Sequence, residues 1–230
     1  MHTADELLRL SRQTAISLRR RGVRTTCEAV LATVGHYWFD VRYGTDTRET
    51  VPLRTLDIAS DNRRRGVDYS ATKPRVFTRF LALLQPDRTG TFVDLGCGKG
   101  RVLLLAAKFG YRKVVGVEFS PQLCRIARSN VSAYWRKTHA ATEFEILETD
   151  VCGYQMRDDE TVYFLFNPFD AVVMRIVREN LEASFHRRPR TISLLYYNPV
   201  CARVLEQGSL FRKVMEARYA GAEAWVYRTQ

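Results

Sequence analysis

Two hydrophobic periods alternate along the chain from about residue 90 onward. Short apolar runs rich in β-branched and aromatic residues are typical of strands buried on both faces of a parallel sheet. Between them, apolar residues recur at spacings of three and four, as in helices that cover such a sheet. The strands are predicted at Thr91–Leu95, Lys113–Val117, Phe144–Leu147, Thr161–Phe166 and Thr191–Tyr197. The helices between them are predicted at Arg101–Phe109, from Pro121 to about Lys137, and at Asp170–Ser184.

This alternation predicts an α/β fold with a doubly wound, mostly parallel sheet. Two more apolar segments, Phe211–Met215 and Ala224–Tyr227, flank a turn at Gly221 and predict a terminal hairpin. A helix at Pro74–Leu84 is predicted just ahead of the first strand, since proline favours an early helical position.

The first 88 residues lack the alternation. Leucines at 7, 8, 10 and 18 predict a helix that ends near Arg20, before Gly22, and a second short helix follows as far as Val34. The segment His36–Leu56 has many aromatic residues but no clean period, so we expect it to be ordered and irregular. We therefore divide the chain into an N-terminal helical and irregular extension, residues 1–88, and a main domain, residues 89–230. The extension is expected to be a cap or a substrate-binding piece.

Composition narrows the class of protein. With 46% hydrophobic residues in 230, the chain has enough apolar material for a large core. Its longest apolar runs fall far short of the ~20 residues of a membrane span, and its first residues lack a signal-peptide pattern. We therefore expect a cytoplasmic protein with no membrane partner. The five cysteines are widely spread without a C-x-x-C pair, which argues against a zinc site and a disulfide framework.

The net charge of +11 comes almost entirely from arginine. Arginine grips phosphate and carboxylate in a bidentate way, so one interpretation is an acidic or phosphate-bearing partner. The other is a solvated, arginine-rich surface. The even spread of the excess along the chain favours the second interpretation and leaves the first open.

Between the first two predicted strands lies a glycine-rich turn, in the stretch Thr91–Ser120. Three alternating glycines, Gly96, Gly98 and Gly100, follow Asp94, and glycines there let the backbone approach a ligand closely. The following helix presents free N–H groups to a ligand. The acid at the end of the second strand, Glu118, can accept hydrogen bonds from a ribose diol. The stretch therefore predicts a nucleoside-binding unit.

The spacing D-x-G-x-G-x-G resembles the first motif of the class I methyltransferases that use S-adenosylmethionine (SAM), and it fits the dinucleotide fingerprint poorly, since Arg101 takes the third glycine's place. The resemblance covers about residues 88–230 and implies a seven-stranded, Rossmann-like sheet with SAM as the cofactor. A looser resemblance reaches forward to Tyr69 and Thr72. With DLGCGKGR and VGVEFSP, these residues look like the lysine methyltransferases of the telomeric-silencing-disruptor type and the related mitochondrial ATP-synthase-subunit enzymes.

The class I resemblance implies a set of cofactor-binding residues. Glu118 takes the place of the ribose-binding acid, and Asp150 that of the acid that accepts the adenine amine, with the next backbone N–H on a ring nitrogen. In this family the segment ahead of the first strand often folds over the cofactor, so Tyr69 is a candidate lid residue. Cys97 lies inside the glycine turn as a small filler. The full predicted set is Tyr69, Asp94, Gly96, Cys97, Gly98, Gly100, Glu118, Phe119, Asp150, Val151 and Asn167.

The acceptor end is predicted where the fourth strand ends, since ligands of such sheets lie at the carboxyl ends of the strands. Asn167-Pro168-Phe169 there resembles the (Asp/Asn)-Pro-Pro-(Tyr/Phe) motif of methyltransferases that modify planar or amide nitrogens, but it lacks the second proline. The resemblance implies that Asn167 accepts hydrogen bonds from the target amine and that Phe169 stacks on it. Tyr197, at the end of the next strand, is a further candidate for the acceptor pocket.

These expectations combine into a SAM-dependent methyltransferase that transfers methyl to a nitrogen of a small molecule or of a protein lysine. Two alternatives stay open: a nucleic-acid N-methyltransferase, acting on RNA or DNA, and a SAM-binding protein without catalysis. No metal site is expected, and the sequence does not identify the methyl acceptor.

Overall fold

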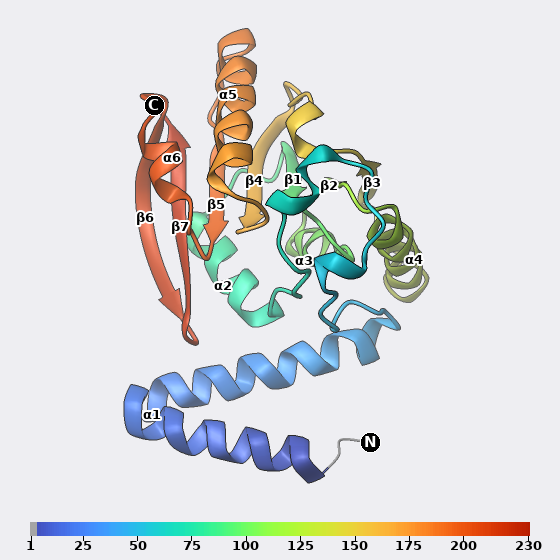
Figure 1. Ribbon diagram of the computed structural model, residues 1–230, viewed down its shortest axis with the longest axis vertical. Coiled ribbons are helices and arrows are strands. Elements are labelled where there is room, and N and C mark those ends of the chain that lie inside the picture. Colours follow the sequence, from blue (N-terminus) through green and yellow to red (C-terminus); the bar gives the residue numbers. More distant parts are fainter. Residues whose placement is uncertain (1–3) are drawn as a thin grey trace.

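The computed structural model describes the backbone of residues 4–230 and the side chains from residue 23 onward. Within this part, seven strands form one sheet in the order β3-β2-β1-β4-β5-β7-β6 (Figure 1). Neighbouring strands from β3 to β5 are parallel, whereas β7 runs antiparallel to β5 and to β6. The predicted doubly wound α/β fold with a mostly parallel sheet is thus confirmed.

The strands lie where the apolar runs predict them: β1 matches, β2, β3 and β4 extend by one or two residues, β5 begins two residues later, and both strands of the terminal hairpin are longer. Their bounds are β1 Thr91–Leu95, β2 Lys113–Glu118, β3 Glu143–Glu148, β4 Glu160–Phe166, β5 Ser193–Tyr197, β6 Phe211–Tyr219 and β7 Ala222–Thr229. The terminal hairpin is longer than predicted because polar residues alternate with apolar ones along β6, so only part of this edge strand forms an apolar run.

Helices cover both faces of the sheet. The α-helices are α1 Ala4–Tyr43, α2 Pro74–Leu84, α3 Arg101–Phe109, α4 Pro121–Thr138, α5 Ala171–Arg187 and α6 Ala202–Glu206, and short 3₁₀ turns form η1 Leu53–Thr55, η2 Asp61–Arg65 and η3 Val151–Gly153. Both α2 and α3 match the predicted bounds. Ser120 caps α4, since its hydroxyl accepts the N–H of Leu123. The one-turn helix α6 was not predicted.

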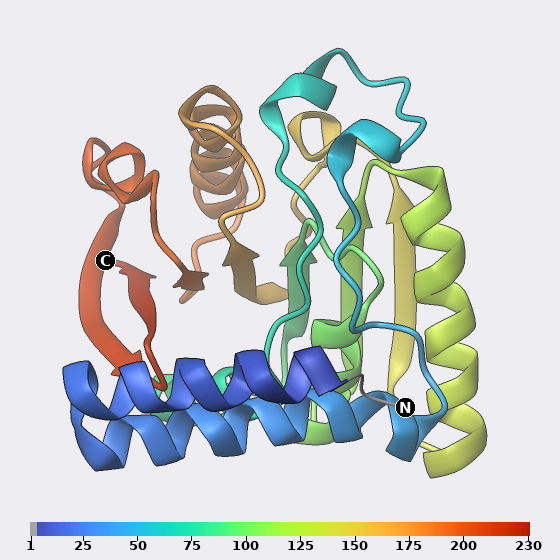
Figure 2. The ribbon, with the colours of Figure 1, turned by 60° about the horizontal axis from the view of Figure 1, so that its bottom comes forward.

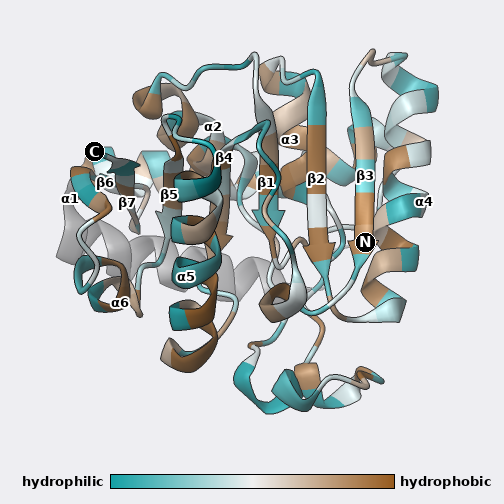
Figure 3. Ribbon diagram, turned by 90° about the horizontal axis from the view of Figure 1, so that it is seen from above, coloured by the Kyte–Doolittle hydropathy of each residue, from teal (hydrophilic) through white to brown (hydrophobic). Residues whose placement is uncertain are grey.

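Two apolar layers hold the fold together. On one face of the sheet, Phe92, Val114 and Phe164 pack with residues of α2 and α3. On the other, Val93, Val115 and Leu165 pack with residues of α5 and α6. Figure 3 shows brown, hydrophobic stretches along β2, and brown and teal residues in turn along β3 and around α5. Burial of both faces is the reason that the central strands β1, β2 and β4 read as nearly continuous apolar runs.

The largest difference from the predicted fold concerns α1. It continues through Gly22 and includes His36–Tyr43, which we expected to be irregular. Its second half buries Ala32, Phe39 and Tyr43, which lie seven and four residues apart and so share one helix face. Figures 1 and 2 show that α1 doubles back into two arms that lie side by side, and Figure 1 shows the second arm next to α2. Packing against the domain, rather than local propensity, keeps this segment helical.

The sheet's connections place the site. From β1 the chain continues toward β2 and β3, whereas β4 and β5 lie on the other side of β1. Ligands of doubly wound sheets bind beyond the carboxyl ends of the strands at such a switch point. Among the described helices, none combines the length and the apolar character needed to cross a membrane.

Candidate active site

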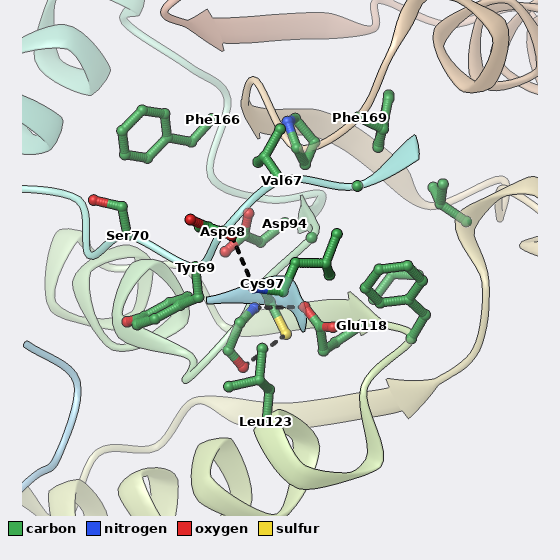
Figure 4. A pocket seen from close by; sticks show the side chains of 18 of the residues that line it. Val67, Asp68, Tyr69, Ser70, Asp94, Cys97, Glu118, Leu123, Phe166 and Phe169 are labelled. Carbon is green, nitrogen blue, oxygen red and sulfur yellow. Dashed lines mark hydrogen bonds between the residues drawn. The ribbon is translucent and has the colours of Figure 1, made fainter. Parts of the chain in front are cut away.

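A cavity of about 930 Å³, measured with its opening, lies at the carboxyl ends of β1, β2 and β4 (Figure 4). Asp94, Glu118 and Phe166 line it from the ends of these three strands. Part of its remaining wall comes from residues 53–72, a stretch that we call the front segment. The cavity thus lies where ligands of doubly wound sheets bind.

The glycine turn forms the floor of this cavity. Gly96, Gly98 and Gly100 have φ angles of +89°, +53° and +82°, in the left-handed region that disfavours other residues. A Cβ at Gly96 would lie 2.7 Å from the Cβ of Pro168, and one at Gly98 would overlap the ring of Tyr69. The first two glycines are therefore required both by backbone conformation and by close packing. Gly100 precedes α3 and lies outside the cavity wall.

Glu118 is held in place by backbone groups. Its Oε2 accepts the N–H of Gly98 at 2.9 Å, and its Oε1 accepts the N–H of Ser120 at 2.9 Å. Burial raises the pKa of Glu118, and these backbone donors oppose the rise. A carboxylate has about four acceptor sites, so each oxygen retains capacity for one hydroxyl of a ligand diol.

Asp94 is 3% exposed and lines the cavity, and its side chain makes no hydrogen bond to another residue in the described part of the chain. Burial, and then the neighbouring Glu118 carboxylate, raise the pKa of Asp94 well above its usual range. A buried carboxylate without a partner is costly, and a cationic or hydrogen-bonding ligand group would relieve that cost. Cys97 beside it is also buried, and burial raises the pKa of its thiol well above the usual value, which suits a filler rather than a nucleophile.

Asp150, Val151 and Phe119 line the cavity together with Leu123. The Oδ2 of Asp150 accepts hydrogen bonds from the hydroxyl of Ser60 and, at 2.9 Å, from the amide of Asn62. Burial pushes the pKa of Asp150 up, but hydrogen bonds from Ser60, the Cys152 N–H and Asn62 together bring it below the usual value. The front segment therefore reaches over to the predicted adenine end.

Tyr69 fastens the front segment to the glycine turn. Its ring lies against Gly98, and its hydroxyl donates to the carbonyl of Thr47 at 2.6 Å. Its backbone also forms an antiparallel bridge with Val51. Burial raises the pKa of Tyr69 above its usual range, so the phenol stays protonated. Tyr69 thus packs on the glycine turn and lines the cavity, and its role as a lid over the cofactor stays a prediction.

The structure brings one of the three predicted acceptor residues to the cavity. Phe169 lines it, whereas Asn167 and Tyr197 do not. Asn167 has a φ of +41°, and its Oδ1 accepts the hydroxyl of Tyr196 at 3.3 Å. Tyr197 packs edge-on against Phe166, with ring centroids 4.2 Å apart, and Phe166 is the residue that faces the cavity. The acceptor roles of Asn167 and Tyr197 stay predictions. In this structure the two side chains contact Tyr196 and Phe166 and do not line the cavity.

A buried polar network behind the glycine turn was missed from sequence. The side chain of Arg101 is 1% exposed and also lines the cavity. Its guanidinium donates to the Thr47 hydroxyl at 2.5 Å and to the Asp40 carboxylate at 3.0 Å, and lies 2.7 Å from Nδ1 of His36. Burial and then Arg101 lower the pKa of His36 to about 4. Arg101 at the start of the otherwise apolar helix α3 was the feature of the sequence that could have indicated this buried network.

Residues 92–187 match the family model described as "Methyltransferase domain". The chain contains a class I, SAM-dependent methyltransferase domain. Its seven-stranded, mostly parallel sheet and its glycine turn are two features that the resemblance to this family implied.

Curated relatives of this methyltransferase domain include two lysine enzymes. Over 66 residues the chain is 38% identical to a protein-lysine N-methyltransferase of Saccharolobus islandicus, covering 28% of this chain and 41% of that protein. Over 130 residues it is 30% identical to the adenine nucleotide translocase lysine N-methyltransferase of Mus musculus, covering 56% of this chain and 53% of the relative. The chain thus spans about half the length, or less, of these relatives.

Solved methyltransferases share the fold at low identity. An RNA methyltransferase from Salinibacter ruber in complex with S-adenosyl-L-homocysteine superposes with a TM-score of 0.53 at 21% identity, over 70% of this chain and 94% of that chain. A ribosomal protein L11 methylase from Lactobacillus delbrueckii gives 0.51 at 13% identity, over 68% of this chain and 78% of its own. These likenesses establish the architecture of the methyltransferase domain.

SAM is the cofactor of this methyltransferase domain, and the cavity suits it. SAM carries a ribose diol, an α-ammonium group and a methyl on a positively charged sulfur. Glu118 offers anchored acceptors for the diol, and Asp94 is a buried carboxylate without a partner, which an ammonium group would satisfy. The donor and acceptor set of the cavity therefore fits the cofactor.

Proposed function

We propose that this protein transfers a methyl group from SAM to the ε-nitrogen of a lysine side chain in a protein. The observation that carries the proposal is a single cavity that joins the glycine turn to an aromatic wall, Phe164, Phe166 and Phe169, in a chain related to lysine N-methyltransferases. An aliphatic amine fits such a wall, because its methylene stem packs on the rings. The sequence also leaves a nitrogen of a small molecule as the alternative acceptor.

In this proposal the chain's own residues bind SAM and orient it toward the lysine amine. Glu118 binds the ribose hydroxyls, Asp94 pairs with the α-ammonium, and Asp150 and Val151 receive the adenine edge. Gly96 and Gly98 let the backbone pass close beneath the methionine portion. Four further residues keep a predicted role in binding the cofactor: Cys97, Gly100, Phe119 and Asn167. Of these, Cys97 and Phe119 line the cavity.

The bound cofactor supplies an electrophilic methyl on a positively charged sulfur. The lysine nitrogen's lone pair forms the new N–C bond, the C–S bond breaks with its electron pair left on sulfur, and the nitrogen's proton leaves to water. Alignment of nucleophile and methyl is the main contribution required of the protein, worth up to ~7–11 kcal/mol in favourable cases. An apolar wall also favours the neutral amine that must attack.

The test is transfer of isotopically labelled methyl from SAM to an extract, followed by separate nuclease and protease digestion. We expect label in protein, recovered after hydrolysis as methyl-lysine, and no label with Glu118→Ala. Label that nuclease releases would replace the proposal with the nucleic-acid alternative. Absence of transfer to any fraction, with SAM bound, would leave the SAM-binding protein without catalysis. A cytoplasmic location and an acidic or phosphate-bearing partner stay predictions.

A further inference from the structure

Four carboxylates line the cavity, and one of them differs from the rest. Glu118 and Asp150 are engaged by the hydrogen bonds given above, and Asp94 is buried. Asp68 is exposed, and its Oδ1 accepts the backbone N–H of Leu53 at 2.8 Å. Among the described residues it makes no other hydrogen bond or ion pair, so Oδ2 is available to a ligand.

The backbone around Asp68 is fixed at both sides. Gly66 forms an antiparallel bridge with Phe169 at the end of β4, and Tyr69 forms one with Val51. Together with the bond from Leu53, these contacts hold the carboxylate at one place on the cavity wall. Its position is thus part of the architecture of the site rather than that of a loose surface side chain.

The neighbours of Asp68 in the cavity suit a cation. Figure 4 shows Asp68 in the middle of the view, with Phe166 and Ser70 to one side and Glu118 to the other. Phe166 is supported edge-on by Tyr197. An aromatic ring and a carboxylate together attract an ammonium group, the ring through its negative face and the carboxylate through charge.

We propose that Asp68 binds the ammonium group of the methyl acceptor and thereby selects amines over neutral groups of the same shape. The inference rests on the proposed function, which it deepens by naming a specificity-determining residue. In this inference the Asp68 carboxylate binds the acceptor as an ammonium group. The ammonium then loses a proton to water, which reaches the site because Asp68 is exposed. The resulting neutral amine attacks the methyl group.

A binding experiment tests this without turnover. Protein saturated with S-adenosylhomocysteine is titrated with butylammonium and, separately, with butanol, a neutral molecule of similar size. We expect the wild type to prefer butylammonium by about tenfold or more, as one charge-assisted contact allows. Asp68→Asn keeps the oxygen that accepts the Leu53 N–H but removes the charge, and it should abolish the preference.

Asp57→Asn is the matched control, because Asp57 is an exposed acid of the same front segment outside the cavity wall. It should leave the preference unchanged, and Asp68→Glu should restore part of it. Unchanged amine preference in Asp68→Asn, with unchanged affinity for S-adenosylhomocysteine as proof of folding, overturns the inference. Loss of affinity for SAM but not for S-adenosylhomocysteine, with amine binding intact, would assign Asp68 to the cofactor's sulfonium and also overturn it.

The same variants separate this inference from the proposed function. Amine binding that depends on Asp68, without methyl transfer by the wild type, contradicts the proposed function alone. Methyl transfer with an acceptor KM that Asp68→Asn leaves unchanged contradicts the inference alone. Because a carboxylate raises the pKa of a bound amine, Asp68→Asn should also shift the pH profile of kcat to lower pH, which a merely structural role would not do.

Discussion

At the scale of single residues, the site depends on contacts in which there is no room for an added atom. Gly98 is the sharpest case, since its positive φ and the ring of Tyr69 both exclude a side chain. Tyr69 in turn is held by Thr47 and Val51. One methyl group at position 98 therefore acts on the glycine turn and on the front segment together.

Gly98→Ala should lower the free energy of unfolding by about 1–2 kcal/mol through the left-handed backbone alone. It should also weaken SAM binding strongly, because the Tyr69 ring must move away from the turn. Denaturant unfolding and calorimetric titration measure the two effects. Combining the change with Tyr69→Ala should restore part of the binding, and full affinity in Gly98→Ala alone would show that the contact is unimportant.

Asp94 gives a prediction for pH. Burial and then the Glu118 carboxylate raise its pKa, so free protein keeps Asp94 protonated at pH values where an ordinary aspartate, near 3.8, is ionised. Pairing with the α-ammonium of SAM favours the ionised form, so binding releases a proton. SAM affinity should therefore rise as pH increases from the ordinary aspartate range up to the raised pKa of Asp94.

Calorimetric titrations in two buffers that differ in ionisation enthalpy measure this proton release directly. The apparent binding enthalpy should differ between the buffers for the wild type and agree between them for Asp94→Asn. Proton uptake, or release that persists unchanged in Asp94→Asn, would show that Asp94 does not pair with the cofactor.

At the scale of elements, the second half of α1 is tied to the start of α3 by the network around Arg101. Asp40 accepts from Arg101 and from the hydroxyls of Thr45 and Thr47. Asn130 on α4 bonds to Asp46 and to the carbonyl of Lys99. The N-terminal extension is thus fastened to the glycine turn by buried polar contacts as well as by apolar packing. Its predicted boundary at residue 88 and its role as a cap stay predictions.

Asp40→Ala should lower the free energy of unfolding by about 3–5 kcal/mol, because it leaves the buried guanidinium of Arg101 without its carboxylate. Urea denaturation is the measurement. Glu28→Ala, on the same helix, removes an ion pair whose arginine is 91% exposed and should cost about 1 kcal/mol or less. Equal costs for the two changes would contradict the weight given to the network.

A comparison of these elements with their predicted bounds shows which parts of the fold can be predicted from sequence. The bounds of β1, α3 and α2 followed from local pattern, because glycine, proline and apolar runs act within a few residues. The helix over His36–Tyr43 was missed because its buried face is completed by residues far along the chain, such as Tyr134. Ser60 and Asn62 were missed for the same reason, since their partner Asp150 lies about 90 positions away.

For the whole molecule, the fold explains why residues from distant segments meet. Parallel strands end at one edge of the sheet, so Asp94, Glu118 and Phe166 arrive together, and the front segment closes over them. The predicted cofactor residues that line the cavity lie at or near these strand ends or in the front segment, whereas Gly100 and Asn167 do not line it. The acceptor side was less predictable, because side-chain direction after β4 depends on a left-handed residue, Asn167.

The central claim is that this cavity is a SAM site organised by Glu118 and the glycine turn. It is tested most directly by calorimetric titration with SAM and S-adenosylhomocysteine beside NAD, for the wild type and Glu118→Ala. The account predicts micromolar binding of both SAM-type ligands, none of NAD, and an affinity about 100-fold lower in Glu118→Ala, as two lost charge-assisted hydrogen bonds imply. Folded protein that binds NAD but not SAM, or unchanged SAM affinity in Glu118→Ala, would contradict it.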